Sequence, residues 1–130
     1  MSLTHPDVLV RRVLEIGWPD GPPVVLRLPE PRKPGNPGPV VPVVRVACPP
    51  ARRTSLGTRE CPVAVQVYAG SDDEAWPLCE RVRSALERAE LVDPEVLGWI
   101  DGQDPHEWPD PDRPTVRRWQ VTGTLIQSIA

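Results

Sequence analysis

Proline sets the strongest limit on what this chain can fold into. The 130 residues include 19 prolines and 9 glycines, a combined share well above the roughly 12% that is usual in soluble proteins. Proline fixes φ and has no backbone N–H, so it interrupts both helices and central strands. Leu, Val and Ile are nevertheless too plentiful for an intrinsically disordered chain. We therefore expect an aliphatic core whose elements are joined by long irregular stretches.

The sequence argues against a membrane-spanning protein and against a protein with a secretory signal peptide. No apolar run approaches the roughly 18 residues that a membrane span requires, so we expect a soluble protein. The first residues, Met1 to Pro6, lack the charged and apolar regions of a signal peptide.

The spacing of apolar residues predicts two helices and several strands. The first helix is expected over 8–16, with Thr4 as its N-cap and Gly17 ending it. Leu9, Val13 and Ile16 form its inner stripe. The second helix is expected over roughly 73–90, with either Ser71 or Asp73 as the cap. Strands are predicted over 24–28, 40–48, 61–69, 97–100 and 115–129.

This order of elements favours an α+β fold. The economical packing is a two-layer sandwich, in which a mostly antiparallel sheet of four to five strands carries two helices. We expect a single domain over residues 1–130, with a proline-rich loop at 29–39 and an acidic loop, rich in Pro and Trp, at 93–114.

Charge is distributed unevenly along the chain although the formal net charge is only −3. Between Arg27 and Glu60 there are seven basic and two acidic residues, whereas thirteen acids and four arginines lie between Asp72 and Arg113. Two interpretations remain open at this point. The two segments neutralise each other within one monomer, or they attract each other between identical subunits arranged head to tail in a ring.

The acidic loop is also the strongest candidate for chemistry. Its possible metal ligands are Asp101, Asp104, His106, Glu107, Asp110 and Asp112. Their spacing matches neither a calcium loop nor a zinc helix, so a solvated acidic loop is favoured. The chain lacks nucleotide-binding and nucleophile motifs and has only two histidines. We expect no catalytic, cofactor or metal site, and specific reading of nucleic acid is improbable at a pI near 5.4.

Cysteines and tryptophans are interpreted as structural. Cys48, Cys61 and Cys79 form no CxxC pair, which favours buried thiols in a reducing compartment. Trp119 is expected in the core. Trp99 and Trp108 either pin the acidic loop or contact a partner, and pinning is favoured.

The layout of elements resembles the tail-terminator proteins of long-tailed phages. An N-terminal helix precedes a short strand ending at Pro29, and a strand of the type P-V-V-R-V follows at 42–46. The strand 63–69 then passes through Ser71-Asp72-Asp73-Glu74-Ala75 into an amphipathic helix, and 118–122 resembles the family's closing strand. The resemblance spans about residues 5–128. The proline-rich segment 29–39 and the acidic segment 93–114 depart from the pattern.

The resemblance implies a structural virion protein with no enzymatic activity. Such proteins form a ring, expected to be hexameric, that caps the tail tube, ends its polymerisation and joins it to the head-side connector. Partners would be further copies of the chain, the tube protein and the connector or neck protein, with DNA passing through the ring unread and no membrane involved. Its place would be the neck region of the virion tail, after assembly in the host cytoplasm. Candidate interface residues are Arg32, Lys33, Arg52, Arg53, Arg59, Asp101, Asp104, Glu107, Trp108 and Asp110. A head-completion or neck adaptor is the alternative, and a small metal-assisted hydrolase a remote one.

Overall fold

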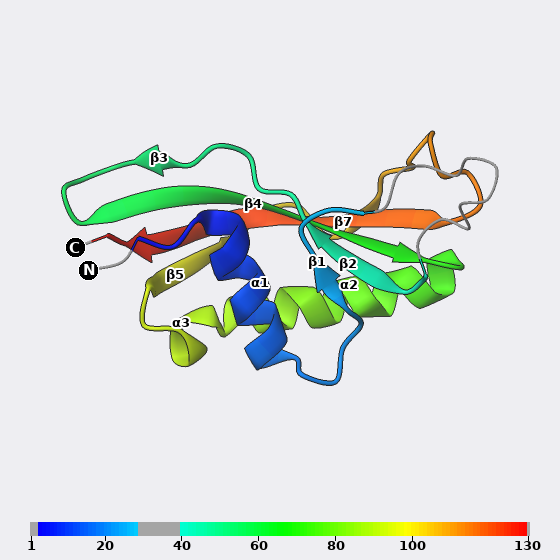
Figure 1. The fold of residues 1–130 in the computed structure, drawn as a ribbon, viewed down its shortest axis with the longest axis horizontal. Helices are drawn as coiled ribbons and strands as arrows, with labels where there is room; N and C mark the ends of the chain where they lie inside the picture. Colours follow the sequence, from blue (N-terminus) through cyan, green and yellow to red (C-terminus); the bar gives the residue numbers. More distant parts are fainter. Residues whose placement is uncertain (1–2, 29–39, 130) are drawn as a thin grey trace.

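Two long antiparallel strands form the centre of the molecule. The computed structural model describes residues 3–28 and 40–129. Strands β4 (Thr58–Ala69) and β7 (Arg117–Ser128) pair without a break over twelve residues each, from Thr58 opposite Ser128 to Ala69 opposite Arg117. At about 3.4 Å per residue, each strand is about 40 Å long. Figure 1 shows this pair running along the longest axis of the fold.

The other strands extend this pair into one sheet with the order β1-β2-β4-β7-β5. These are β1 (Val24–Val25), β2 (Val43–Val46) and β5 (Val96–Asp101). Two-residue strands β3 (Arg52–Arg53) and β6 (His106–Glu107) pair with β4 and β7, respectively. Among the strands of the described residues, only β1 and β2 pair in parallel. The predicted α+β sandwich with a mostly antiparallel sheet is confirmed.

Three helices cover one face of the sheet: α1 (Pro6–Gly17), α2 (Asp72–Glu87) and the single-turn α3 (Ala89–Val92) (Figure 1). Alternate residues of β4 point toward them, which explains the period-two pattern of this strand. The core contains Leu9, Val13, Cys61, Val63, Val65, Val67, Cys79, Val82, Leu86, Val121 and Leu125. No helix in the described ranges combines the length and the hydropathy that crossing a bilayer requires.

The start of α1 differs from the prediction. His5, rather than Thr4, is the N-cap, and its Nδ1 accepts a hydrogen bond from the Asp7 N–H at 3.2 Å. The Thr4 hydroxyl instead donates to the Glu95 carboxylate at 2.7 Å. The Thr4 hydroxyl, predicted to cap the helix, is therefore hydrogen-bonded to the carboxylate of Glu95, a residue far away in the sequence.

The start of α2 resolves the choice between two caps. The Ser71 side chain accepts from the Glu74 N–H at 3.2 Å, so Ser71 caps the helix and Asp73 lies within its first turn. Three acidic residues follow the cap, where the positive end of the helix dipole stabilises them. Pro77 lies inside the helix, and the predicted segment 73–90 is divided into α2 and α3.

Two further segments differ from expectation. Part of the basic segment 49–60, which lies between the predicted strands 40–48 and 61–69, forms a hairpin in which Arg52 pairs with Glu60 and Arg53 with Arg59. The N–H groups of Thr54 and Ser55 both point to the Thr58 carbonyl and close its turn. Ile16, expected on the inner stripe of α1, is 53% exposed. The proline-rich loop at 29–39 lies outside the described residues.

Candidate interaction surfaces

The acidic loop is paired mainly with arginines of its own chain. Arg83 on α2 lies 2.9 Å from Asp104 and 3.5 Å from Asp101 (N–O distances), and it also faces Glu80 and Glu87. Hydrogen bonding to Asp104, together with the surrounding carboxylates, raises the pKa of Arg83. Four carboxylates thus share one guanidinium, and this part of the surface keeps negative charge.

Asp110 lies inside the molecule and is only 7% exposed. Its carboxylate accepts hydrogen bonds from the Tyr68 hydroxyl at 3.2 Å and from Arg113 at 3.1 Å, with Arg118 3.7 Å away. Burial alone would raise the pKa of Asp110, but the Asp112 backbone N–H and these side chains outweigh it, so the pKa lies below its ordinary value. The loop is therefore anchored to the face of the sheet opposite the helices.

Neighbouring residues of the acidic loop also contact side chains of the same chain. The Arg118 guanidinium carbon lies 4.6 Å from the centre of the Trp108 ring, a cation–π distance, while Trp108 remains 47% exposed. Arg117 is 3.9 Å from Glu107. Trp99 packs against the core and its Nε1 donates to Asp101 at 2.7 Å. These contacts favour pinning of the loop by its indoles, and Trp108 keeps a free face.

The basic residues divide into two groups. Arg59 donates to the Gln127 side chain at 2.6 Å and to the Thr4 carbonyl at 3.1 Å, so it has an internal structural role. Arg52 and Arg53, on the β3–β4 hairpin, are exposed, and the nearest ion pair, Arg52 with Glu60, is 3.9 Å long. Arg32 and Lys33 lie outside the described residues. The hairpin thus presents free positive charge, beside a Leu56 that is 89% exposed.

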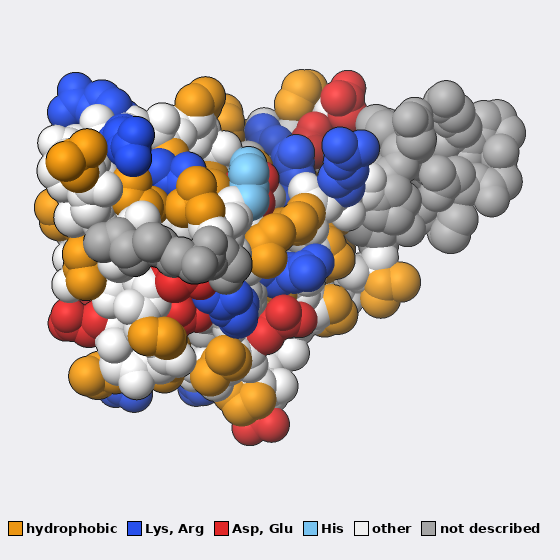
Figure 2. Space-filling model, turned by 60° about the vertical axis from the view of Figure 1, so that its left-hand side comes forward, with side chains coloured by type: hydrophobic (Ala, Val, Ile, Leu, Met, Phe, Trp, Pro, Cys, Tyr) orange, Lys and Arg blue, Asp and Glu red, His pale blue; other side chains and the backbone are white. Residues whose placement is uncertain are grey.

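Figure 2 views the end of the molecule at which both termini lie. Basic, acidic and apolar side chains are interspersed over this face, and blue side chains gather along its upper edge, at the height of β3. This mixture is typical of protein contact surfaces rather than of a strip that binds nucleic acid phosphates.

Gln127 connects both ends of the chain to this end of the sheet. Its side chain is fully buried, donates to the Thr4 carbonyl at 2.8 Å and accepts from Arg59. Glu95 links the same cluster to Arg12 of α1 at 2.7 Å. Burial would raise the pKa of Glu95, but hydrogen bonds from Thr4, Arg12 and Gln127 lower it.

The residues that the sequence suggested as metal ligands or catalytic groups do not come together in one site. Within the described parts of the chain, no group of three His, Cys, Asp or Glu side chains could hold a metal ion. His106 contacts the Asp104 carbonyl at 3.1 Å, and His5 caps α1. Burial raises the pKa of Cys48 and of Cys79 to about 12, so both thiols stay protonated at neutral pH.

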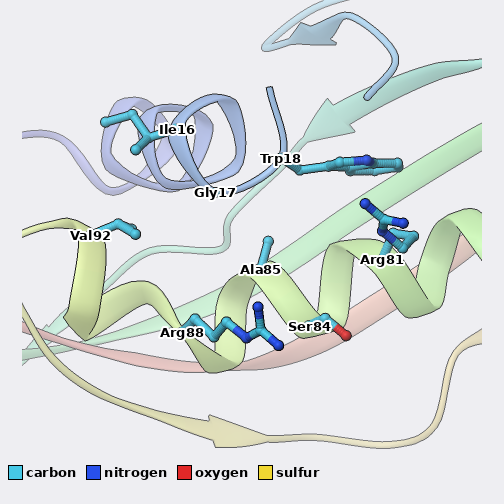
Figure 3. A pocket seen from close by; sticks show the side chains of 8 residues that line it. All are labelled: Ile16, Gly17, Trp18, Arg81, Ser84, Ala85, Arg88 and Val92. Carbon is cyan, nitrogen blue, oxygen red and sulfur yellow. The ribbon is translucent and has the colours of Figure 1, made fainter. Parts of the chain in front are cut away.

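A groove of about 370 Å³ lies between the end of α1 and the outer side of α2 and α3. It is lined by Ile16, Trp18, Arg81, Ser84, Arg88 and Val92, with Gly17 and Ala85 at its base (Figure 3). Sequence reasoning missed this surface. The available signal was a tryptophan placed directly after a helix-ending glycine, and two arginines seven positions apart on one side of α2.

The comparisons with known proteins point to a component of a virion. A chain from a structure titled "Virion of native gene transfer agent (GTA) particle" has the same fold, with a TM-score of 0.55 and 15% identity; the match covers 95% of this chain and 87% of that chain. A chain of that virion thus has a fold similar to the one described here. A search of curated proteins gave no match.

The family assignment follows from the sequence itself. The model of the family "Tail completion protein gp17" matches residues 24–126, and the chain belongs to this family of structural phage tail proteins. The resemblance to phage tail-terminator proteins is confirmed.

Proposed function

We propose that the protein is a tail terminator, which forms a ring at the end of the tail tube, stops its polymerisation and joins it to the head-side connector. The observation that carries this proposal is the family match over residues 24–126, on a fold that a virion-like particle also contains. The ring is expected to have six subunits. The protein would act through its shape and charge, without making or breaking covalent bonds.

The β3–β4 hairpin is our candidate for the contact with the tube or the connector. Arg52 and Arg53 are exposed at its start, and Leu56 at its tip is 89% exposed. A basic hairpin with an apolar tip can bury the leucine while its arginines pair with carboxylates at the rim. Asp101 and Asp104 are already held by Arg83, so we assign the hairpin to another virion protein rather than to the acidic loop of a neighbouring copy.

The acidic surface formed by α2 and β5 would contact the second partner, on the other side of the ring from the one that the hairpin contacts. Glu80, Glu87, Asp101 and Asp104 surround Arg83, which leaves this surface negatively charged. Negative charge would also suit a ring through which DNA passes without being held, because phosphates are repelled rather than bound.

The test uses purified tail tubes and the full chain. We expect electron microscopy to show added density at one end of each tube, and elongation of growing tubes to stop when the protein is added. The variant Arg52→Glu/Arg53→Glu is expected to lose tube capping while remaining folded. The matched control, Arg11→Glu/Arg27→Glu, changes the net charge equally at positions outside the hairpin and should cap normally.

The same images distinguish the alternative. Density on the portal side of the particle, with tube ends left bare, would identify a head-completion or neck adaptor instead. Tubes that keep growing with the protein present would contradict the terminator proposal.

A further inference from the structure

The groove between α1 and α2 combines an aromatic wall with two cationic side chains. Figure 3 shows the Trp18 ring above the Arg81 guanidinium, with Ala85 at the base between the two helices. The Arg81 guanidinium carbon lies 5.5 Å from the centre of the Trp18 ring. Ile16, at the other end of the groove, is 53% exposed. A ligand for this groove would therefore offer an apolar or aromatic side chain.

The charge of the groove is unbalanced. Throughout residues 3–28 and 40–129, no carboxylate forms an ion pair with Arg81 or Arg88. Other arginines of α1 and α2 do have such partners: Arg11 pairs with Glu15, Arg12 with Asp93 and Arg83 with Asp104. The groove is thus complementary to an aromatic side chain that has carboxylates next to it.

The same chain presents such a segment near the start of α2. Trp76 is 48% exposed, and Asp73 and Glu74 lie within one turn of it. Both acids are exposed; the Glu74 carboxylate accepts a hydrogen bond from the Gly70 N–H at 3.3 Å, and within the described residues no basic side chain forms an ion pair with either acid. Exposed tryptophan and unpaired arginine are the residue types that dominate binding energy at interfaces.

This segment is out of reach of the groove of its own molecule. Arg81 follows Trp76 by five positions, which places it about 8 Å further along the helix axis and roughly 140° around it, and Arg88, the C-cap of α2, follows Trp76 by twelve positions, about 18 Å. The contact must therefore form between copies. Because the two surfaces are different and lie on different parts of α2, repeated contacts run head to tail and close into a ring when the rotation permits.

We infer that Trp76 of one subunit inserts into the groove of the next, where Asp73 and Glu74 pair with Arg81 and Arg88. This inference rests on the ring of the proposed function, for which it supplies the contact between subunits. It differs from the expectation that the acidic loop meets the basic segment of a neighbour.

The experiment is a test by charge reversal with the full chain. Sedimentation velocity is measured from micromolar concentration to about 1 mM, the range in which weak association is detectable. Wild type is expected to associate beyond a dimer. The groove variant Arg81→Glu/Arg88→Glu and the segment variant Asp73→Arg/Glu74→Arg should each lower the association constant at least tenfold, because each brings like charges together.

Mixing the two variants is the decisive step. In an equimolar mixture every contact again joins opposite charges, so association should return to within about threefold of wild type. The variant Arg11→Glu/Arg27→Glu serves as the control for net charge and should associate like wild type. If a reversed variant fails to fold, Trp76→Ala removes the inserted side chain without changing charge and should weaken association equally.

The contrary results are well defined. A monomeric wild type up to about 1 mM, a dimer that never grows further, or a mixture that stays dissociated would each overturn the inference. Tube capping is scored separately by electron microscopy. A wild type that caps tubes while the reversed variants also cap them refutes this contact alone, whereas a wild type that leaves tube ends bare refutes the proposed function.

Discussion

Trp99 of β5 covers Gly123 of β7 so closely that a Cβ built on Gly123 would lie 2.3 Å from the indole. The carbonyl oxygen of Ile100 would lie 2.7 Å from the same atom. The edge strand β5 is thus held against β7 by a ring that needs the glycine beneath it. This contact also keeps the start of the acidic loop against the sheet.

We therefore expect Gly123→Ala to destabilise the fold by about 1–3 kcal/mol, because backbone as well as a ring must shift to admit the methyl group. The midpoint and slope of urea unfolding measure the effect. Gly98→Ala, on β5, is the matched control, because a Cβ there meets nothing within 4 Å, and it should change stability by less than about 0.5 kcal/mol. Equal effects of the two substitutions would refute the close contact.

Asp110 should make stability depend on pH in the acidic range. Its pKa is lower in the folded chain than in the unfolded one, so its ionised form stabilises the fold above the unfolded value of about 3.9. That contribution is lost as the pH falls through the lowered folded value. The difference in unfolding free energy between wild type and Asp110→Asn should be constant above about pH 5 and shrink below about pH 4.

Urea unfolding of both proteins across this pH range measures the difference directly. Glu95 titrates in both proteins, so its own lowered pKa cancels in the comparison. Asp20→Asn, at an exposed position, should unfold like wild type at every pH. A difference for Asp110→Asn that is undiminished at pH 2 would contradict an ionised, paired Asp110.

Gln127 should be sensitive to loss of its amide. Gln127→Leu keeps a side chain of similar size at this buried position but removes the acceptor for Arg59 and the donor to the Thr4 carbonyl. Leaving buried polar groups without partners costs about 1–3 kcal/mol. Gln103→Leu, an exposed residue of the acidic loop, is the control and should have little effect on thermal unfolding. Similar melting temperatures for both variants would show that the hydrogen bonds of Gln127 do not stabilise the fold.

The three cysteines should resist modification in the native state. Cys61 and Cys79 are fully buried, and burial raises the pKa of all three thiols. Because the thiolate is the reactive form, we expect less than one fast-reacting thiol with Ellman's reagent at pH 8. Three should react once the chain is unfolded in guanidinium chloride. Rapid native reaction of Cys79 would show that α2 opens from the sheet.

Much of the fold was predictable because its pattern is local. The alternation of Val63, Val65 and Val67 in β4 was predicted, and Ser71 was one of the two predicted caps of α2, because both signals come from neighbouring residues. The short pairings of β3 and β6 were missed, since two-residue strands leave no periodic signal. The cap at Thr4 was wrong because its partner, Glu95, lies 91 positions away.

The surfaces were harder to predict than the fold. Counting charges along the chain indicated an acidic segment, but the count could not reveal that Arg83, Arg113, Arg117 and Arg118 fold onto it. The groove depends on the distance between the end of α1 and the side of α2, a tertiary relationship without a sequence motif. Only the arrangement in space separates the charges that are already paired from those that remain available.

The uninterrupted pairing of β4 with β7 has a mechanical consequence. One end of the pair leads into the basic hairpin and the other into the first turn of α2. A pull applied between the start of β4 (Thr58) at one end of the pair and the start of β7 (Arg117) at the other would load the whole hydrogen-bonded ladder in shear, so that its bonds resist together rather than opening one after another. Each subunit would then behave as a stiff strut, and an assembly of such struts would transmit a displacement at one rim to the other with little loss.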